Sequence, residues 1–266
     1  MQFDFGENWF DYSKRALTPE RFGQAKADLS TLTEGIELQG KRFLDIGFGQ
    51  GLTLLNAAGM GANVTGCDIN PKCAQALELT RSRMTNQQGV EVKIVVGSIL
   101  DGQVAEQVRR VGGDDDGQFD IVHSWGVLHH TGNMKQAINI AASLVRPSGY
   151  LILALYNRHW SSSIWRFIKR TYCSSPRVVQ RLSIWGMYPI IWLAKLLVTG
   201  RNPFRQQRGM DFFYNVVDWV GGYPYEYATI DEVHGLVEPL GFQRIRVLPA
   251  EVPTGCNEFV YRKNFT

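Results

Sequence analysis

The sequence predicts an α/β fold built on an open, mainly parallel sheet, with a helical segment inserted late in the chain. Three observations lead to this prediction. Short apolar runs alternate with helical stretches through residues 40–157, the first run ends in a glycine-rich turn at 47–51, and the second run ends in Asp68. Open α/β sheets bind ligands outside the carboxyl ends of their strands, so the turn and Asp68 indicate a ligand site.

The composition is typical of a globular protein. The chain has 266 residues, 44% of them apolar, and a formal charge of +3, so it is long enough to bury a full core. Residues 1–20 carry several carboxylates and no apolar core of signal-peptide type, so we expect a cytoplasmic protein. The four cysteines form no C-x-x-C pair, which predicts free thiols and no metal site.

Residues 3–39 have the pattern of a helical lead-in. Thr18-Pro19-Glu20 is a helix start, because Thr is a common N-cap residue and Pro fits the first turn. A cluster of rings lies upstream of it: Phe3, Phe5, Trp9, Phe10 and Tyr12. Two roles stay open for this cluster, which either packs the edge of the sheet or forms a lid over a bound ligand.

The first strand ends in a turn with a distinctive spacing of glycines. Gly47 and Gly49 match the dinucleotide pattern G-x-G-x-x-G, but the sixth position is Leu52 and the third glycine is Gly51. Preceded by Asp45, this spacing resembles motif I of the class I S-adenosylmethionine (SAM) dependent methyltransferases. The resemblance implies that Asp45 and the three glycines hold SAM. The missing dinucleotide glycine argues against a rival class, the nucleotide-dependent oxidoreductases.

The second strand, residues 63–68, ends in a carboxylate. Asp68 lies 19 positions after Gly49, close to the spacing of about 20 at which an acid meets ribose hydroxyl groups. A carboxylate can accept two hydrogen bonds from a vicinal diol, so a ribose role is our prediction. The alternative is an N-cap for the helix that begins near Pro71. The resemblance also places Ile69 in the cofactor site.

Further strands and helices alternate downstream. Helices are expected over 52–60, 71–86, 102–111 and 135–144, and strands over 90–96, 119–125 and, after a turn at 146–149, 150–156. Ser98 stands where the family has an acidic residue, and the resemblance implies that Ser98 and Ile99 contact the adenine. Ser124 and Trp125 end the fourth strand, and the same resemblance places them in the cofactor site.

His129 and His130 lie in the loop after the fourth strand, where the resemblance puts the transferred methyl group. Histidine titrates near neutral pH, so either ring can serve as a general base. The alternative is that one of them only hydrogen-bonds the loop backbone. His123, inside the strand, is expected in the core. Positions expected to face the acceptor follow the fifth strand: Tyr156, Asn157 and His159.

The resemblance covers most of the chain. Strand–helix units span residues 40–157, and a helix at 229–240 with strands at 242–248 and 258–261 matches the C-terminal part of the superfamily. It implies a Rossmann-like, seven-stranded sheet, SAM as cofactor, S-adenosyl-L-homocysteine (SAH) as product, and no metal. The expected parts are a SAM-binding core with an N-terminal lid (1–157), a helical cap (158–228), and a last helix with an antiparallel strand pair (229–266).

The inserted segment is strongly basic. Residues 158–208 contain ten Lys or Arg and no Asp or Glu. Residues 161–173 have the spacing of an amphipathic helix, and the uncharged run at 182–194 is too short to span a bilayer. Three roles stay open: a cap over the site, a cap that also contacts anionic membrane or a lipid-linked acceptor, and a nucleic-acid surface. The last role lacks a recognisable RNA-binding module.

Aromatic and acidic residues crowd the end of this segment, among them Tyr223, Tyr225 and Glu226. They suit a polyhydroxyl acceptor such as a sugar, and they also suit a packed hinge between two parts of the chain.

The sequence therefore predicts a SAM-dependent methyltransferase that acts on a small or lipid-linked acceptor. O-methylation is favoured because candidate bases are present. We expect a cytoplasmic enzyme in peripheral contact with a membrane through residues 158–208. Two alternatives remain: a SAM-binding membrane-docking or regulatory module without turnover, and an RNA methyltransferase.

Overall fold

The computed structural model describes residues 3–84, 90–204 and 210–265. Its centre is a seven-stranded sheet with the order β3-β2-β1-β4-β5-β7-β6. Neighbours among β1 to β5 pair in parallel, and β7 runs antiparallel between β5 and β6. The strands are β1 (Arg42–Ile46), β2 (Asn63–Asp68), β3 (Val92–Val96), β4 (Phe119–Trp125), β5 (Val145–Tyr156), β6 (Phe242–Leu248) and β7 (Cys256–Lys263). The predicted fold class is confirmed.

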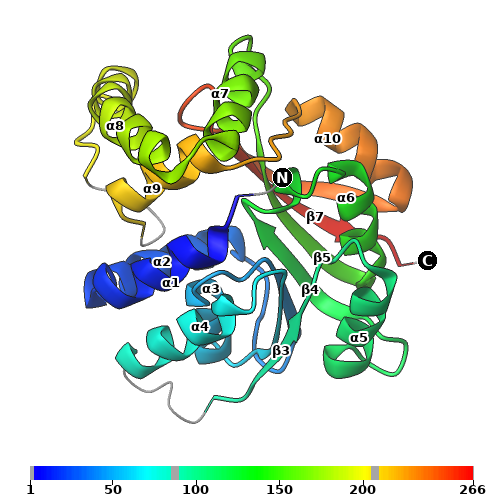
Figure 1. Ribbon diagram of the computed structural model, residues 1–266. Coiled ribbons are helices and arrows are strands. Elements are labelled where there is room, and N and C mark those ends of the chain that lie inside the picture. Colours follow the sequence, from blue (N-terminus) through cyan, green and yellow to red (C-terminus); the bar gives the residue numbers. More distant parts are fainter. Residues whose placement is uncertain (1–2, 85–89, 205–209, 266) are drawn as a thin grey trace.

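Helices cover both faces of the sheet (Figure 1). One face carries α1 (Phe5–Arg15), α2 (Pro19–Leu32), α3 (Leu52–Gly59) and α4 (Lys72–Arg83), and the other carries α5 (Gly102–Gly112), α6 (Met134–Ser143) and α10 (Ile230–Val237). Short 3₁₀ turns occupy η1 (Leu128–His130) and η2 (Glu238–Leu240). As predicted, Thr18 is the N-cap of α2. The helix predicted at 71–86 is α4, which ends at Arg83 with Met84 as its C-cap, and residues 85 and 86 lie outside the described residues.

The central strands are buried on both faces, which is why they read as apolar runs rather than alternating ones. Successive side chains of a strand point to opposite faces. Accordingly Leu44 and Val122 pack with α5 and α6, whereas Phe43 and Ile121 pack with the N-terminal helices, and all four side chains are fully buried. The sheet therefore separates two hydrophobic cores and holds its strand ends rigidly.

One predicted turn lies inside a strand. β5 begins at Val145, which pairs with Phe119, and its register shifts before Tyr150 pairs with Ile121. The segment 146–149 bulges out between these pairs, and Ser148 has a φ of 62°. The predicted turn is therefore a bulge within β5, and the strand starts earlier than expected because Val145 already joins the sheet.

Three helices follow β5 and gather on one side of the molecule (Figure 1): α7 (Ser162–Ser174), α8 (Arg177–Thr199) and α9 (Phe212–Gly221). They share a small core made of Tyr172, Ile184, Phe212, Val216 and Val220.

The uncharged run at 182–194 lies within α8, which has 23 residues. Of the described helices, α8 is the one that is long and apolar enough to cross a bilayer by length and composition. The run at 182–194 alone is too short to span a bilayer, but the full length of α8 does not exclude a span. Arg205 and Arg208, two of the basic residues counted above, lie outside the described residues.

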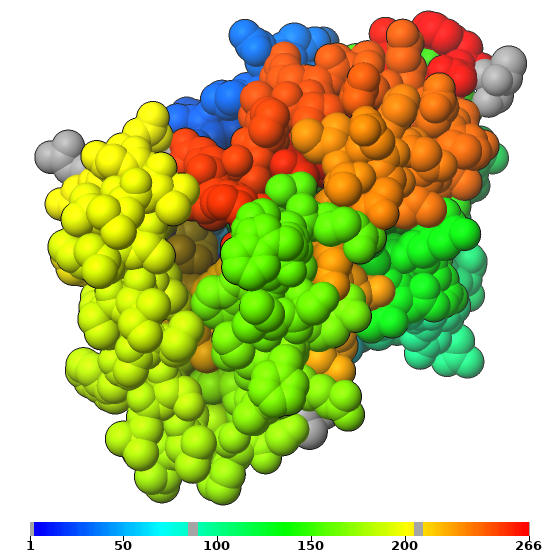
Figure 2. Space-filling model, turned by 90° about the horizontal axis from the view of Figure 1, so that it is seen from above, coloured from blue at the N-terminus to red at the C-terminus, as the bar shows by residue number. Residues whose placement is uncertain are grey.

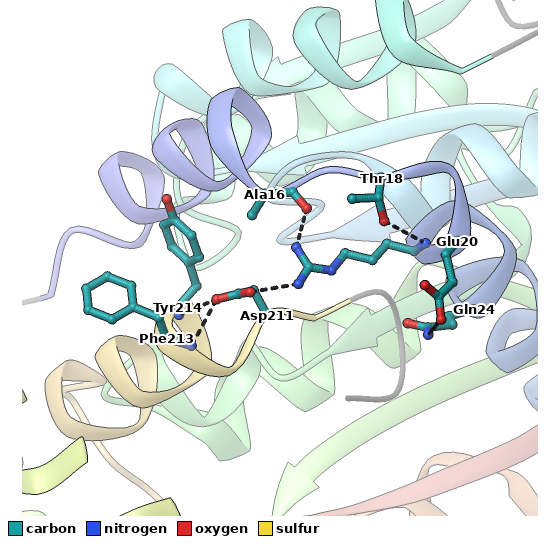
Figure 3. Close-up of polar contacts among 8 residues, drawn as sticks. Ala16, Thr18, Glu20, Gln24, Asp211, Phe213 and Tyr214 are labelled. Carbon is teal, nitrogen blue, oxygen red and sulfur yellow. Dashed lines mark hydrogen bonds and ion pairs between the residues drawn. The ribbon is translucent and has the colours of Figure 1, made fainter. Parts of the chain in front are cut away.

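A set of polar contacts ties α9 to the N-terminal helices (Figure 3). Asp211 is the N-cap of α9, and its Oδ2 accepts a hydrogen bond from Arg21 Nη2 at 2.7 Å. Arg21 also donates to the carbonyl oxygen of Ala16. The Tyr214 hydroxyl donates to Asp11 Oδ2 at 2.7 Å. These contacts bring α1 and α9, which are far apart in the sequence, to the same edge of the sheet.

Candidate active site

A cavity of about 840 Å³ opens at the carboxyl ends of β1, β2, β4 and β5. Small-molecule sites usually occupy about 300–1,000 Å³. The strand ends supply one side of the cavity, and much of the rest comes from α1, α2, α7, α8, α9 and the segment between β6 and β7. Figure 2 shows a hollow between the carboxyl end of α8, in yellow, and the β6–β7 segment, in red-orange. The cavity lies where open α/β sheets bind ligands.

The glycine turn presents bare backbone to this cavity. Gly47 and Gly49 line it, with φ values of 77° and 55°. A Cβ atom on Gly47 would lie 2.3 Å from Cγ2 of Val127, so no side chain fits there. Gly51 is not among the lining residues, and a Cβ atom there would lie 2.2 Å from Cδ1 of Leu77. Two of the three predicted glycines therefore reach the cavity, and the third allows α3 and α4 to pack.

Asp68 lines the cavity at the end of β2. Its Oδ2 accepts a hydrogen bond from the Gly49 N–H at 3.1 Å, and its Oδ1 accepts one from the Asn70 N–H at 2.9 Å. Burial raises the pKa of this carboxyl, and the two backbone bonds oppose that shift. The capping role falls to the next polar residue, because Asn70 Oδ1 accepts from the Lys72 N–H at 3.0 Å. The Cys73 thiol also hydrogen-bonds this carboxylate, whose two oxygens together offer about four acceptor sites.

Two predicted adenine-side residues, Ser98 and Ile99, line the cavity beside Asp68, and so does Ile69, which was predicted in the cofactor site. Ile69 is 50% exposed although it is apolar, whereas Ile99 is buried. The Ser98 hydroxyl accepts a hydrogen bond from the Leu100 N–H at 3.3 Å, which shapes the turn. An exposed isoleucine beside a cavity offers an apolar face to a flat ligand.

A carboxylate–imidazole pair lies beneath the glycine turn. Asp45 Oδ1 and His123 Nδ1 are 2.7 Å apart, both side chains are buried, and both residues line the cavity. An ionised carboxylate can only accept, so Nδ1 of His123 carries a proton. His123 Nε2 has no hydrogen-bond partner among the described residues. The sequence placed His123 in the core, as found, but did not indicate its contact with Asp45, which belongs to a different strand.

The two residues that end β4 have different roles. Ser124 is fully buried, its hydroxyl donates to the Ile46 carbonyl oxygen at 2.9 Å, and it is not among the lining residues. Trp125 lines the cavity, and its indole Nε1 donates to Glu258 Oε1 at 2.6 Å. Ser124 therefore joins β4 to β1, whereas Trp125 and Glu258 line the cavity.

The two candidate histidines differ in their access to the cavity. His130 lines it, and its Nδ1 donates to the Pro224 carbonyl oxygen at 2.6 Å, because a carbonyl can only accept. Its Nε2 therefore carries the lone pair. His129 is completely buried, is not among the lining residues, and accepts from the Tyr156 N–H at 3.3 Å. Burial lowers the pKa of both rings, that of His130 to about 3 with help from the charge of Lys169.

A buried lysine lies close to Tyr156 and Trp219, two aromatic residues that line the cavity. Lys169 of α7 is fully buried, and its ammonium donates to the carbonyl oxygen of Trp219. Its Nζ atom lies 4.6 Å from the ring centroid of Trp219, 4.8 Å from that of Tyr225 and 5.6 Å from that of Tyr156. Such cation–π contacts replace part of the lost hydration of the ammonium. Desolvation nevertheless lowers the pKa of Lys169 to about 7.

Of the predicted acceptor-side residues, Tyr156 lines the cavity, whereas five do not: Asn157, His159, Tyr223, Tyr225 and Glu226. Three of these five have evident packing roles. Asn157 Nδ2 donates to the Pro253 carbonyl oxygen at 2.9 Å, and Glu226 Oε2 accepts from the Met134 N–H at 2.9 Å at the start of α6. Tyr225 is 2% exposed. The stretch around Tyr223 therefore behaves as the packed hinge rather than as a sugar platform.

The outer wall of the cavity includes Phe5, Trp9, Trp165, Ile191, Ala194, Lys195, Val198, Asp218, Trp219, Glu251 and Val252. The sequence indicated part of it, because Phe5 and Trp9 belong to the N-terminal ring cluster, and Asp218 and Trp219 belong to the aromatic and acidic stretch that ends the inserted segment. In α8 a usable signal was that residues 191, 194, 195 and 198 share one helical face, whereas Glu251 and Val252 were missed. Phe5 and Trp9 from the N-terminal ring cluster line the cavity, while Tyr12 packs in the core, so both open roles of that cluster are represented. Within the described residues, no group of three or more His, Cys, Asp or Glu side chains could hold a metal ion.

One cavity is thus lined by residues from the motif I resemblance, by Asp68 and by the loop after β4. A family model described as a methyltransferase domain matches residues 18–189. The chain belongs to the methyltransferase domain family. The resemblance to class I SAM-dependent methyltransferases is confirmed by this match and by the seven-stranded fold.

Members of the family with known names extend the comparison. A ubiquinone biosynthesis O-methyltransferase from Dechloromonas aromatica is 34% identical over 141 residues, which cover 53% of this chain and 55% of the relative. A protein of the same name from Xanthomonas euvesicatoria is 34% identical over 143 residues, covering 54% and 52%. The chain spans about half the length of the curated relatives it matches.

Solved structures share the fold at lower identity. Magnesium protoporphyrin IX methyltransferase from Synechocystis PCC 6803 with bound SAH has a TM-score of 0.54 and 16% identity, over 91% of this chain and 83% of that one. A SAM-dependent methyltransferase from Methanosarcina mazei has a TM-score of 0.51 and 17% identity, over 86% and 94%. At these identities the likeness establishes the fold and leaves the acceptor to be argued from the site.

Proposed function

We propose that the protein transfers the methyl group of SAM to a hydroxyl oxygen of a small or lipid-linked acceptor. The observation that carries this proposal is the cavity, where bare backbone and a carboxylate lie at one end and an aromatic wall lies at the other. Membership of the methyltransferase domain family supports the same reaction, and so do the names of the relatives, which are O-methyltransferases of ubiquinone biosynthesis.

The cofactor end of the cavity fits SAM. At Gly47 a ligand meets the main chain directly, as the methionine end of SAM requires. Asp68 accepts hydrogen bonds from two backbone N–H groups and from the Cys73 thiol, and its carboxylate keeps acceptor capacity for the ribose hydroxyl groups. Ile69 and Ile99 offer apolar faces to adenine, with Ser98 at the edge of the ring. Asp45 and Trp125, which were also predicted to contact SAM, line the same end of the cavity.

The acceptor end of the cavity is suited to orienting an acceptor molecule against the methyl group of SAM. SAM, when bound, supplies a methyl group that is already activated on a sulfonium. The protein then has to align the acceptor oxygen and exclude water, because orientation supplies much of the rate enhancement. Tyr156, Trp165 and Trp219 provide flat faces against which a ring-bearing acceptor would stack. The neutral His130 offers Nε2 as a hydrogen-bond acceptor for a hydroxyl group.

We also propose that α7 and α8 rest on an anionic membrane. Large apolar side chains point outward from both helices: Phe167 is 71% exposed, Leu182 67% and Trp185 73%. Three exposed arginines flank the turn between the helices, Arg170, Arg177 and Arg181, and none forms an ion pair with a described residue. Apolar and basic side chains together are typical of interfacial helices on anionic lipid.

The inner face of α8 favours a helix that lies on the bilayer rather than across it. Ile191, Ala194 and Val198 line the cavity from this face, so α8 is part of the wall of the site. A helix in this position would lose its contacts with the cavity wall if it left the protein to span a membrane. The arrangement would let a lipid-linked acceptor pass from the bilayer into the cavity along α8.

Purified protein with methyl-labelled SAM and an alkylated phenol tests the proposed reaction. The same phenol without its chain and the O-methyl ether of the alkylated phenol are the controls. We expect SAH to form and label to enter the phenol, with more label on the alkylated form and none on the ether. SAM binding without SAH formation on any hydroxyl compound would instead identify a binding module, and label transferred to RNA would identify an RNA methyltransferase.

A further inference from the structure

Helix α9 brings a carboxylate to the acceptor end of the cavity. Asp218 lines the cavity together with Asn215 and Trp219 of the same helix. Its Oδ1 atom accepts a hydrogen bond from Nδ2 of Asn8 in α1, at 2.6 Å. Tyr156, at the end of β5, lines the same region, and its ring centroid lies 5.4 Å from that of Trp219. Asp218 is therefore a cavity-facing carboxylate with one side fixed by a neutral amide.

The surroundings of Asp218 make it a stronger base than an ordinary aspartate. Burial raises the pKa of its carboxyl to about 7, although the Asn8 hydrogen bond and the charge of Lys169 oppose the shift. The titratable groups that face it are Lys169 of α7 and Tyr156 of β5, with His130 beyond Tyr156 on the same wall. A base whose pKa lies near the working pH is substantially deprotonated and still binds a proton strongly, so it is well suited to general base catalysis.

The other candidate bases are less well placed. His129 does not line the cavity. His130 does, but its Nδ1 proton is held by the Pro224 carbonyl, and a pKa of about 3 makes its Nε2 a weak proton acceptor. Lys169 is fully buried and bonded to the carbonyl of Trp219.

We propose that Asp218, rather than either histidine, accepts the proton that leaves the acceptor hydroxyl group as its oxygen is methylated. The inference rests on the O-methylation proposed above. The acceptor O–H bond breaks and its proton passes to the Asp218 carboxylate, while a new O–CH₃ bond forms. The S–CH₃ bond of SAM breaks and its electron pair stays on sulfur, which leaves neutral SAH. The proton later leaves Asp218 for solvent, so each turnover releases one proton.

The test compares wild type with Asp218→Asn, which keeps an oxygen for the Asn8 donor and removes the basic carboxylate. We expect kcat/KM for the phenol to fall by about 10²- to 10⁴-fold, the usual contribution of a general base. The affinity for SAM should stay within about twofold, because Asp218 lies at the acceptor end. The wild-type rate should rise with pH through about 7, as the carboxylate loses its proton, and this rise should vanish in the variant.

A second variant and a matched control separate a base from a structural residue. Asn8→Leu removes the hydrogen bond that lowers the pKa of Asp218, so the rising limb should move to higher pH. Asp231→Asn changes an exposed carboxylate in the first turn of α10 that is not among the lining residues, so its pH profile should match wild type.

A readout without turnover completes the test. In protein with ¹³C-labelled aspartate, the carboxyl resonance that disappears in Asp218→Asn belongs to Asp218, and we expect it to titrate near pH 7. Titration near pH 4, or an unchanged pH–rate profile in Asp218→Asn, would overturn the assignment. Wild-type protein that methylates none of the hydroxyl compounds would instead contradict the proposed function, so the two failures are distinguishable.

Discussion

At the scale of single residues, the cofactor end of the cavity is built from backbone. Asp68 is held by the N–H groups of Gly49 and Asn70, and Gly47 is held against Val127. Neither arrangement depends on a long side chain, so little conformational freedom has to be lost when a ligand binds. Substitutions here should change ligand affinity in ways that follow directly from the geometry.

Replacing Asp68 by Ala removes the carboxylate that would accept two ribose hydroxyl groups. Hydrogen bonds to a charged group contribute about 1.5–3 kcal/mol each, so we expect SAM affinity to fall at least about 10-fold. Isothermal titration calorimetry measures this, with circular dichroism as a check on folding. Asp101→Ala, which removes the N-cap of α5 outside the cavity, is the control. Equal SAM affinity in Asp68→Ala and wild type would remove the ribose assignment.

Replacing Gly47 by Ala places a Cβ atom 2.3 Å from Val127 at a φ of 77°. The left-handed backbone alone costs an alanine about 1–2 kcal/mol, and the clash adds to it. We expect a lower melting temperature and loss of SAM binding. The double variant with Val127→Ala relieves the clash but not the backbone cost, so it should recover only part of the stability. Full recovery would show that the φ value is not a constraint.

Lys169 should make stability depend on pH. Its pKa is 10.5 in the unfolded chain and about 7 in the folded protein. Between these values the unfolded chain binds the proton and the folded protein does not, so stability rises with pH through this window. Below about pH 7 both states are protonated and the residue contributes no slope.

In Lys169→Met the rise in melting temperature between pH 7 and 9 should shrink, and thermal unfolding at several pH values measures it. Lys26→Met, at an exposed position of α2, is the matched control. Identical slopes for Lys169→Met and wild type would contradict the argument.

At the scale of elements, α8 faces two environments. Its inner side lines the cavity and contacts α9, and its outer side exposes Leu182, Trp185 and Leu197. The outer residues recur at helical spacing, so their exposure is a continuous stripe rather than isolated side chains. Together with the exposed arginines, this stripe gives α8 a surface suited to lipid. The opposite face of the same helix still lines the cavity.

Wild-type protein should therefore sediment with vesicles of anionic lipid at low salt and should be released as salt rises, since the arginine contribution is screened. The double change Leu182→Glu and Trp185→Glu should abolish sedimentation while leaving SAM affinity unchanged. Ile245→Glu, on the edge strand β6 where the side chain is 50% exposed, is the control. Equal sedimentation with neutral and anionic vesicles would contradict the proposed contact.

At the scale of the whole molecule, the cavity is closed by parts of the chain that are far apart in the sequence. Trp9 of α1 lies beside Gly49 of the glycine turn, the Phe5 ring packs against His130, and Asn8 of α1 holds Asp218 of α9, 210 positions away. A ligand that fills the cavity therefore touches the core, the N-terminal helix and the inserted helices at once. Its binding energy should stabilise all three against local opening.

SAH binding should slow amide hydrogen exchange in α1 as well as in the glycine turn, and hydrogen–deuterium exchange mass spectrometry measures both. Exchange in α5, which lies on the opposite face of the sheet and contributes no lining residue, is the internal reference. Protection confined to residues 45–51 would show that α1 is not part of the closed site.

Local pattern was sufficient for most elements and for the residues of the glycine turn and Asp68 that line the cavity. The apolar runs specified the strands, Thr18 marked a helix start, and the glycine spacing with Asp68 located the ligand end, because each of these depends on neighbours within a few residues. The acceptor wall was different. Asp218, Trp9 and the β6–β7 segment come from distant parts of the chain, and Asp45 meets His123 only because β1 and β4 pair in the sheet. A burial environment or a cavity wall is created when such elements pack, so no stretch of sequence carries it alone.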